Sequence, residues 1–585
     1  MARTPVAHRA IHLTAWTVFC ILACGSALLG QTIATVTPNS APNSGRVRVT
    51  GAGFGAAGEL LFDGQPGVVS RWSATEIVGF VPESVALGPV SVVVQTASGT
   101  SAPMTITVEP RIPNGRVKWR FLLDSWAISG QPPGIGPDGS IYFDEGFGDL
   151  YALDPNGGLK WIYDSTEVAT GGPDGGGREG PIPVAADGTV ILGATLLGGI
   201  ARIHAVNPDG SRRWVFETGS TQGVIVGPGI GPDGNIYAAV DNAFTGSIGV
   251  FSLDPLGNLR WSDPGAPAVG EYGQAYGHRI AFGADRFHFA AKPGGGGGAP
   301  TLWTFSFGGD QEWVSTSGYD SDPATDALNR VIVASSFYGV TAYEPDGDVA
   351  WQTAPPESGS SIIAPVLSPS GDIFVGHGFD GIWSLDSNGV TRFYEDGASF
   401  GIPANFGVTP SGAYLLEGGR QTFGVPGWVR AYSTVDGALE WQVDLPDVGG
   451  DFVTNSRPAF SPDGSTAYVC VIVLGSSSDS YLYAIDVTGG AVGLFERGDC
   501  NTDGLFDISD AVRALGALFV PGSDPLGCRD ACDTNDDGLF DISDAVFALN
   551  ALFVGGAATL PAPVGICGVD GTLDGLDCEA DPACP

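Results

Sequence analysis

The feature that most constrains the fold of this chain is a glycine followed four residues later by a large aromatic residue, a pattern that occurs eight times. Successive copies lie about 46 residues apart on average, which is the length of one four-stranded blade of a β-propeller. The eight pairs are Gly115/Trp119, Gly157/Trp161, Gly210/Trp214, Gly257/Trp261, Gly309/Trp313, Gly347/Trp351, Gly389/Phe393 and Gly437/Trp441. The repeat predicts a ring of eight β-blades.

Each repeat also carries strand and turn signals. A strand with alternating faces usually precedes the glycine, as in residues 150–154 and 382–386, and Pro-Asp-Gly turns such as residues 137–139 lead into the strand before it. The last repeat, residues 462–490, has no Gly/aromatic strand of its own, whereas the first such strand, residues 115–121, precedes any complete blade. We therefore expect these two ends to pair and close the ring, which removes exposed sheet edges.

Residues 111–495, which carry these repeats, resemble the PQQ-like, or quinoprotein-type, propeller repeat. The resemblance implies an eight-bladed propeller in which the repeated Trp packs between neighbouring blades as core. Quinoprotein dehydrogenases of that family bind PQQ and calcium, with a vicinal Cys-Cys disulfide and a catalytic Asp. This region contains one cysteine, Cys470, so that redox site is not carried over.

Residues 32–110 alternate apolar and polar side chains in short runs, such as 47–49, 90–92 and 104–108, separated by Gly- and Pro-containing turns. This pattern predicts a small sandwich. Its turns, including Gly51-Ala52-Gly53-Phe54-Gly55, resemble those of an IPT/TIG domain, an immunoglobulin-like spacer and binding module. The segment offers no nucleophile, base or ligand cluster, so we interpret it as a spacer.

The N-terminus has the layout of a secretory signal peptide, residues 1–30: Arg3 and Arg9 are followed by an apolar run from Leu13 to Leu29. We expect a secreted or cell-surface protein with no membrane span once this segment is removed. Two alternatives stay open, which are lipidation of Cys24 and retention of the segment as an anchor. The net charge of -38 repels phosphate backbones, so nucleic acid is excluded as a partner.

A twelve-residue acidic pattern occurs twice in the C-terminal segment, residues 496–585, and the two copies start 34 residues apart. Oxygen ligands at loop positions 1, 3, 5, 9 and 12, a Gly at position 6 and a carbonyl at position 7 are the pattern that Ca²⁺ requires. The predicted calcium ligands are Asp499, Asn501, Asp503, Leu505 (carbonyl), Asp507 and Asp510, and Asp533, Asn535, Asp537, Leu539 (carbonyl), Asp541 and Asp544. A pair of ordinary acidic turns is the alternative.

After each loop, apolar residues recur at helical spacing, and we expect one helix to follow each loop and to pack through these residues. They are Val512, Leu515, Leu518 and Phe519, and Val546, Leu549, Leu552 and Phe553. Two such units resemble a dockerin domain, whose helices dock into a cohesin partner; the Ile-Ser pairs at positions 10 and 11 depart from the usual Ser-Thr of type I dockerins. Six cysteines in this segment predict up to three disulfides, with the pairing left open.

The sequence thus predicts a mainly β protein made of an immunoglobulin-like sandwich, an eight-bladed β-propeller and a small α calcium-loop domain. Four histidines, His204, His278, His288 and His377, are isolated from one another, and no catalytic or cofactor-binding residue is assigned. We interpret the chain as an exported, non-catalytic, calcium-binding scaffold that binds extracellular protein or polysaccharide. A secreted polysaccharide-degrading enzyme carrying a dockerin is the alternative, and a quinone-dependent dehydrogenase is the third hypothesis.

Overall fold

The computed structural model describes most of the chain after residue 30. The described residues are 31–111, 116–123, 132–144, 149–165, 182–194, 200–219, 225–240, 249–264, 279–291, 301–315, 321–335, 338–356, 364–377, 381–395, 406–418, 427–445, 451–453, 457–474, 480–488, 495–520, 522–523, 526–554, 559–568, 576, 578 and 584. The predicted signal peptide with Cys24, the first glycine of the repeat, Gly115, and His278 lie outside them. The described residues are mainly β, with two helices.

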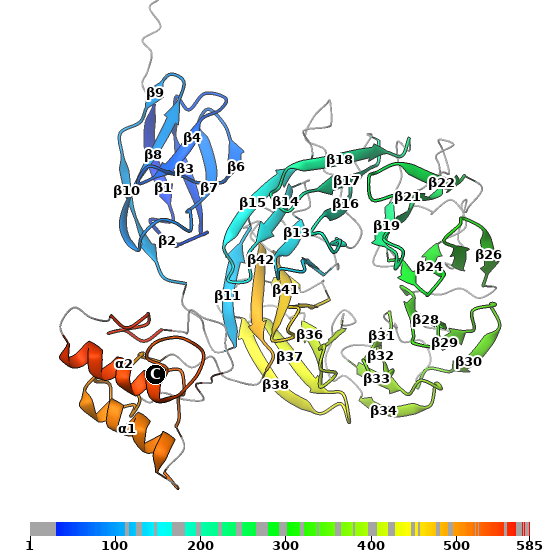
Figure 1. Cartoon of the computed structure of the whole chain (residues 1–585). Helices are drawn as coiled ribbons and strands as arrows, with labels where there is room; N and C mark the ends of the chain where they lie inside the picture. The colour runs from blue at the N-terminus through cyan, green and yellow to red at the C-terminus, as the bar shows by residue number, and fades with distance from the viewer. Residues whose placement is uncertain are drawn as a thin grey trace, which may run out of the picture.

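The first unit, residues 31–110, contains two sheets that share one core (Figure 1). One sheet has the order β1-β3-β7-β6, and the other has the order β2-β10-β8-β4-β5 with β9 paired to β8. Their bounds are β1 Thr32–Thr37, β2 Ser40–Pro42, β3 Arg46–Ala52, β4 Glu59–Phe62, β5 Gln65–Pro66, β6 Val69–Trp72, β7 Glu76–Phe80, β8 Gly88–Thr96, β9 Gly99–Thr100 and β10 Met104–Glu109. We call this the two-sheet unit. Its core residues alternate along the strands, as in β3, where Val47 and Val49 are buried, as the alternation in the sequence predicts.

Eight sheets then form a ring around a central opening, and we number these blades in chain order (Figure 1). Blades 1 to 4 contain β12 Gly134–Ile135, β13 Ile141–Asp144, β14 Asp149–Leu153 and β15 Leu159–Asp164; β16 Val190–Ala194, β17 Arg202–Val206 and β18 Arg212–Glu217; β19 Ile225–Ile230, β20 Ile236–Val240, β21 Val250–Leu253 and β22 Leu259–Asp263; and β23 Ala281–Phe282, β24 Arg286–Ala291, β25 Thr301–Ser306 and β26 Gln311–Val314. Within each of these blades, the first strand in the chain faces the opening and the last faces outward.

Blades 5 to 7 repeat this arrangement, and blade 8 combines both ends of the region. They contain β27 Ala324–Thr325, β28 Val331–Ser335, β29 Gly339–Tyr343 and β30 Val349–Thr353; β31 Val366–Leu367, β32 Ile373–His377, β33 Gly381–Leu385 and β34 Thr391–Glu395; β35 Phe406–Val408, β36 Tyr414–Gly418, β37 Gly427–Ser433 and β38 Leu439–Leu445; and β39 Asp451–Val453, β40 Ala459–Phe460, β41 Thr466–Leu474, β42 Ser480–Asp486 and β11 Val117–Leu122. Strand β11 pairs antiparallel with β42, so the expected closure of the ring is confirmed.

The repeated aromatic residues connect each blade to the next one. In six blades the Trp indole N–H donates to a backbone carbonyl in the outer turn of the following blade, at 2.9–3.2 Å. The glycine of that following turn lies under the indole, because a Cβ at Gly257 would come within 2.6 Å of Trp214. Each of the seven repeat glycines that the structure describes thus lies against the aromatic residue of the preceding blade rather than the one four residues after it. The expected packing of the Trp between blades is confirmed.

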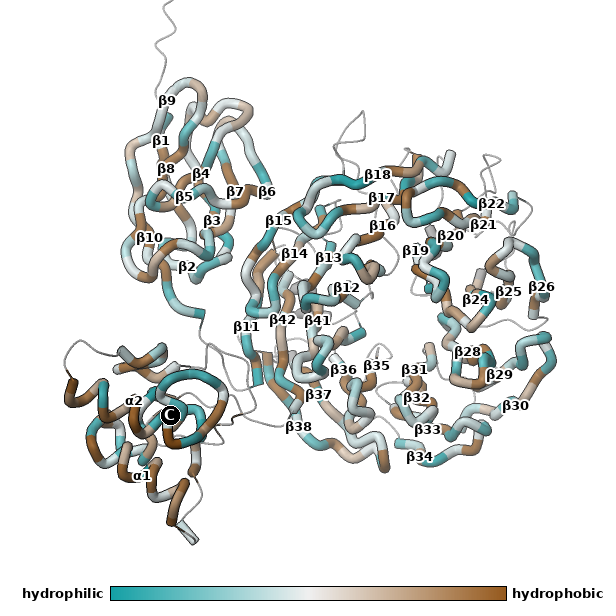
Figure 2. The backbone as a smooth tube through the Cα atoms, viewed as in Figure 1, coloured by the Kyte–Doolittle hydropathy of each residue, from teal (hydrophilic) through white to brown (hydrophobic). Residues whose placement is uncertain are grey.

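The inner strands differ from the alternation that the sequence predicts. Strand β14 is buried at four of its five positions, and all five positions of β33 are buried. The reason is that each blade is covered on both faces by its neighbours, so both faces of a middle strand meet apolar side chains. Figure 2 shows hydrophobic residues concentrated along these strands.

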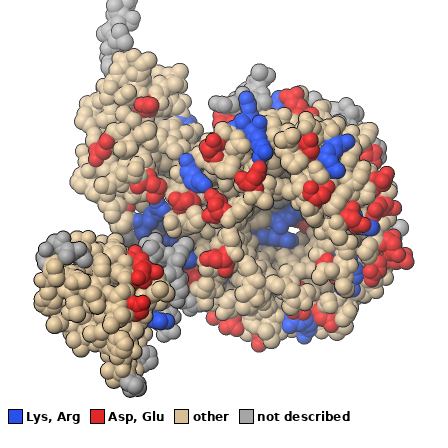
Figure 3. Space-filling model, in the orientation of Figure 1, with Lys and Arg blue, Asp and Glu red and all other residues tan. Residues whose placement is uncertain are grey.

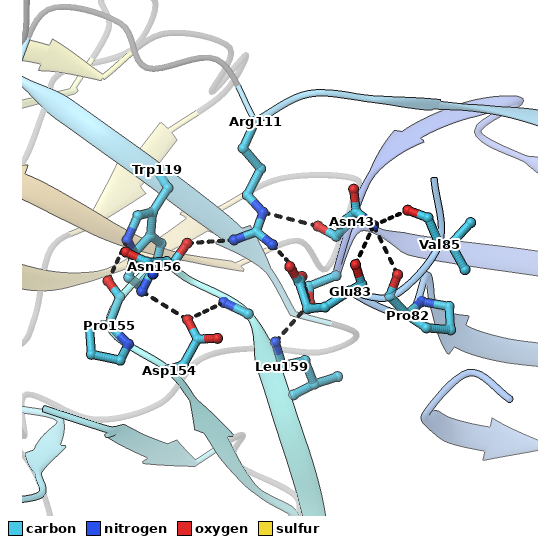
Figure 4. Close-up of polar contacts among 12 residues, drawn as sticks. Asn43, Pro82, Glu83, Val85, Arg111, Trp119, Asp154, Pro155, Asn156 and Leu159 are labelled. Atoms are coloured by element: carbon cyan, nitrogen blue, oxygen red, sulfur yellow. Dashed lines mark hydrogen bonds and ion pairs between the residues drawn. The ribbon is translucent and has the colours of Figure 1, made fainter. Parts of the chain in front are cut away.

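A polar contact joins the two-sheet unit to blade 1 (Figure 4). Arg111 donates from Nε to the carbonyl of Asn43 (3.2 Å) and from Nη1 to the carbonyl of Asn156 in blade 1, and its guanidinium pairs with Glu83. Arg111 therefore forms polar contacts with both the two-sheet unit and blade 1.

An apolar contact lies beside it. Phe80, at the end of β7, is buried and stacks on Phe121 of β11 with ring centroids 5.3 Å apart, and its edge meets Tyr151 at 6.2 Å. The backbone N–H of Leu159 also donates to Oγ of Ser44 (2.7 Å). Because Phe80 belongs to the same core cluster as β11 and β14, the two-sheet unit is packed onto the ring.

The C-terminal segment forms two helices, α1 Ile508–Phe519 and α2 Ile542–Phe553, which pack against each other (Figure 1). One helix follows each acidic loop, as the sequence predicts. We call residues 495–584 the C-terminal module.

Candidate functional site

The first acidic loop folds around its own backbone N–H groups. The carboxylate of Asp499 accepts from the backbone N–H of Asp503 (2.9 Å) and of Gly504 (2.7 Å), and Oδ1 of Asn501 accepts from the same Asp503 N–H (2.9 Å). Asp510, at loop position 12, accepts from the backbone N–H of Asn501 at 3.1 Å. The side-chain oxygens of positions 1 and 3 therefore converge on one point of the loop, and position 12 closes it.

The second loop has the same geometry. The carboxylate of Asp533 accepts from the backbone N–H of Asp537 (3.3 Å) and of Gly538 (2.9 Å), and Oδ1 of Asn535 accepts from Asp537 N–H at 3.1 Å. Asp544 closes this loop through the backbone N–H of Asn535 (3.5 Å). The duplicated sequence has thus produced two copies of one local structure.

The acidic residue at position 9 of each loop caps the following helix. Asp507 accepts from the backbone N–H and the hydroxyl of Ser509, and Asp541 does the same with Ser543, all at 2.7 Å. Both carboxylates are exposed and take part in a capping box with the position 12 residue. This second role as helix cap was missed by the sequence analysis, although an Asp directly before a helix, with an acidic residue three positions later, resembles a capping box.

Burial sets the acid strength of the closing residue in each loop. It raises the pKa of Asp510 to about 6, with further raising by the carboxylates of Asp499 and Asp503, although two backbone N–H groups oppose the shift. It also raises the pKa of Asp544 to about 7, and Asp533 adds to that shift. Each loop therefore holds buried carboxylates that repel one another, which is a donor set whose charge a divalent cation would offset.

The remaining predicted ligands lie nearer the surface. Asn501 and Asn535 are half-buried, Asp503 and Asp537 are exposed, and Leu505 and Leu539 point their side chains to solvent while their backbones stay in the loop. Within the described residues, no three His, Cys, Asp or Glu side chains are grouped closely enough to hold a metal ion.

Disulfides and a buried arginine hold the two loops together. The six cysteines of the module form three bridges, Cys500–Cys532, Cys528–Cys578 and Cys567–Cys584, which selects one of the pairings that the sequence left open. Cys500 and Cys532 each adjoin the first ligand position of a loop, so their bridge joins the loops directly.

The sequence analysis missed Arg497, which lies directly before the first loop and is fully buried. Its guanidinium pairs with Asp536 of the second loop at 3.0 Å and donates to the carbonyl of Asp533. An Arg directly before an Asp-rich loop was the available signal, because a buried cation needs acidic partners.

The apolar residues of the two helices do not all pack as the sequence predicts. Ala511 and Ala514 of α1 and their counterparts Ala545 and Ala548 of α2 are buried. In contrast, Val512, Phe519, Val546 and Phe553 are 51–65% exposed, together with Ile508 and Ile542. The helices meet through small residues, so these Val and Phe side chains face outward, whereas Leu515 packs against the core of the module as predicted. Figure 2 shows hydrophobic residues along both helices.

In the ring, His204 and His288 are fully buried rather than grouped at a site. Nδ1 of His204 bonds the Tyr163 hydroxyl (3.0 Å), and Nδ1 of His288 bonds the Thr304 hydroxyl (2.9 Å). These contacts fit structural histidines. Among the described residues there is no helix with the length and hydropathy needed to cross a membrane.

Comparisons with known proteins concern the ring. A family model described as "Outer membrane protein assembly factor BamB" matches residues 107–271, a range that starts at the end of the two-sheet unit and includes blades 1 to 3. No curated protein matches the chain. Among solved structures, BamB from Moraxella catarrhalis aligns at 12% identity with a TM-score of 0.44, over 63% of this chain and 99% of that one. The family match agrees with the repeats seen in the sequence and supports a PQQ-type β-propeller.

Proposed function

We propose that the chain is an exported, calcium-binding scaffold whose C-terminal module attaches it to an extracellular protein partner. In this proposal the ring is a non-catalytic, eight-bladed propeller, the two-sheet unit is an immunoglobulin-like spacer of the IPT/TIG type, and the C-terminal module is dockerin-like. The ring presents its surface to extracellular protein or polysaccharide. The observation that carries the proposal is the pair of acidic loops with the same ligand residues at the same positions, each of which is followed by a helix with exposed apolar side chains.

The loops supply the metal part of the proposal. One Ca²⁺ would be held by Asp499, Asn501, Asp503, Asp510 and the carbonyl of Leu505, with Asp507 acting through water. The equivalent residues of the second loop would hold another. The bound ions would offset the repulsion among buried carboxylates and fix the direction in which each helix leaves its loop. The cohesin-like character of the partner rests on the dockerin resemblance.

The helices supply the docking part. Val512 and Phe519 on α1, and Val546 and Phe553 on α2, present large apolar surface to solvent at matching positions. Exposed apolar residues grouped on an otherwise acidic module are typical of protein-binding surfaces. Because the two helices present the same residue types, either one could meet the same kind of partner.

Calcium binding is tested by isothermal titration of the full chain with Ca²⁺. We expect two sites, and we expect Asp510→Asn combined with Asp544→Asn to remove both, because each substitution takes away the buried carboxylate that closes a loop. Asp444→Asn, at an exposed position in β38, is the matched control and should leave binding unchanged. An unaltered titration of the double variant, or no heat with the unmodified chain, would contradict the proposal.

Attachment is tested by a pull-down from the exterior proteins of the producing cell, with calcium or with a chelator. We expect a partner in calcium only, weaker capture after Phe519→Ala or Phe553→Ala alone, and no capture after both. Val435→Ala, which removes an equally exposed apolar side chain in the ring, is the control. If the partner is captured equally well with a chelator and by the double variant, docking through the helices is contradicted.

A further inference from the structure

Charged residues occur at equivalent positions on the inner rim of the ring. Arg279 lies two residues before β23, Asp322 two residues before β27 and Arg457 two residues before β40, and Ala364 holds the same position before β31. These short strands are the innermost strands of blades 4, 5, 8 and 6 and border the central opening (Figure 1). Because the blades repeat one another by rotation, the four residues occupy the same end of the opening.

Polar contacts link these residues in two pairs. Nε of Arg279 lies 3.8 Å from Oδ2 of Asp322, whose Oδ1 also accepts from the backbone N–H of Arg279 at 3.3 Å. Arg457 donates from Nη2 to the carbonyl of Ala364 at 3.0 Å. Blade 7 lies between the blades of Arg457 and Ala364, so this side chain reaches over the opening instead of along its own blade.

The charge of Arg457 is not neutralised by an ion pair within the described residues. No carboxylate there lies within ion-pair distance of its guanidinium, which donates to a backbone carbonyl instead. Burial lowers the pKa of Arg457 to about 9, and the neighbouring Arg279 lowers it further while Asp322 opposes the shift. Arg457 therefore stays protonated at neutral pH and is repelled by the positive charge of Arg279, in a chain whose net charge is -38.

Solvent reaches this group although protein surrounds it. The side chains of Arg279 and Asp322 keep 20% and 15% of their surface exposed. Figure 3 shows Lys or Arg atoms inside the central opening of the ring, where the surface is hollowed. A small molecule entering the opening would meet guanidinium donors in a place where surrounding protein weakens the screening of charge by water.

We propose that Arg279 and Arg457 form a binding site for a small oxyanion, a carboxylate or phosphate group, at the inner rim of the ring. A guanidinium presents N–H donors in a planar fork that matches both groups, and an anion between the two arginines relieves their repulsion. Asp322 holds Arg279 in place and also competes with the anion for it. The site is separate from the C-terminal module and does not depend on calcium or on docking.

The test is isothermal titration of the calcium-free full chain with inorganic phosphate and, in a second arm, with succinate. We expect one site for at least one of the two anions, with affinity that falls as salt rises. Phosphate binding alone assigns a phosphate-bearing ligand, and succinate binding alone assigns a carboxylate. No binding of either anion at 10 mM overturns the proposal.

Variants at the rim separate binding from folding. We expect Arg457→Gln to weaken binding at least tenfold, whereas Arg202→Gln, which removes an arginine paired with Glu217 on the outside of blade 2, leaves it unchanged. Asp322→Asn should tighten binding several-fold, because the competing carboxylate is gone. A purely structural role for the group predicts weaker binding or unfolding for Asp322→Asn, and that result, or equal binding by Arg457→Gln and Arg202→Gln, would overturn the proposal.

Discussion

At the scale of single residues, the ring depends on glycines that combine a left-handed backbone with contact to an indole. Gly257 has φ of +83°, and a Cβ there would lie 2.6 Å from Trp214 of the preceding blade. Gly234, in the same blade, has φ of +78° but no atom within 4 Å of its position for a Cβ. Substitutions at these two glycines can therefore distinguish the cost of backbone strain from the cost of a clash with the Trp side chain.

We therefore expect Gly257→Ala to lower the free energy of unfolding of the ring by about 2–4 kcal/mol, because strain and overpacking add. Gly234→Ala should cost only about 1 kcal/mol, since strain acts there alone. Urea unfolding followed by tryptophan fluorescence measures both values. Equal losses for the two variants would show that the indole contact adds nothing.

A second residue-scale prediction concerns acid. Burial lowers the pKa of His288 to about 3, with a further contribution from Arg286, so the folded ring keeps this imidazole neutral. Between pH 6.5 and 3 the unfolded chain binds a proton that the folded chain does not, so stability falls as pH decreases, by up to about 1.4 kcal/mol per pH unit. Above pH 6.5 the histidine contributes no pH dependence.

His288→Gln removes this titration while offering an amide to Thr304. We expect the loss of unfolding free energy between pH 7 and pH 5 to be smaller in His288→Gln than in the unmodified chain. Denaturant unfolding at the two pH values is the measurement. A loss of equal size in both proteins would place the acid sensitivity in other groups.

At the scale of elements, one disulfide connects the two acidic loops. Cys500–Cys532 encloses a sequence separation of 32 residues and adjoins the first ligand position of each loop. Its removal leaves the unfolded module with more freedom, which corresponds to about 2–4 kcal/mol. We expect Cys500→Ser combined with Cys532→Ser to lower the melting temperature of the module and leave the melting of the ring unchanged, as seen by calorimetry.

Cys470→Ser is the control for this prediction, since Cys470 lies in β41 and outside the three bridges. It should not change the melting of the module. If the double variant melts like the unmodified chain, the bridge does not stabilise the two loops.

Elements also show what the sequence could and could not predict. The Gly/aromatic spacing predicted the blades and the closing role of β11, because both follow from one local repeat. It could not show that Gly257 contacts Trp214 rather than Trp261, since neighbouring blades meet only in three dimensions. The spacing of Val512 and Phe519 predicted a helix correctly but gave the wrong buried face, because the two helices pack closely through Ala511 and Ala514.

The same limit applies to the candidate sites. The oxygen ligands of the two loops are contiguous in the sequence, so their pattern could be found there, whereas calcium binding itself stays a prediction. Arg279, Asp322 and Arg457 are far apart in the chain and share no motif. Only the rotation from blade to blade brings them to one rim. A site built from several blades depends on how the blades are placed around the ring, which a single sequence does not reveal.

At the scale of the whole molecule, three parts depend on one another to different degrees. The two-sheet unit is packed onto blade 1 and β11 through Phe80 and Arg111, whereas the ring is closed by backbone pairing between β11 and β42. These two connections lie next to each other in the sequence, so they can be separated by deletions that differ by only a few residues.

We expect the ring to need β11 but not the two-sheet unit. A chain that begins at residue 116 lacks Phe80 but keeps β11, and it should unfold in one transition close to that of the unmodified ring. A chain that begins at residue 124 also lacks β11, which leaves β42 as an open edge and removes Trp119 from the outer turn of blade 1. It should melt at a lower temperature and aggregate, because unpaired strand edges join other chains. Calorimetry and light scattering compare the two deletions, both of which lack Phe80. If both behave alike, closure by β11 contributes little, and the blades are held together mainly by the contacts between each Trp and the next turn.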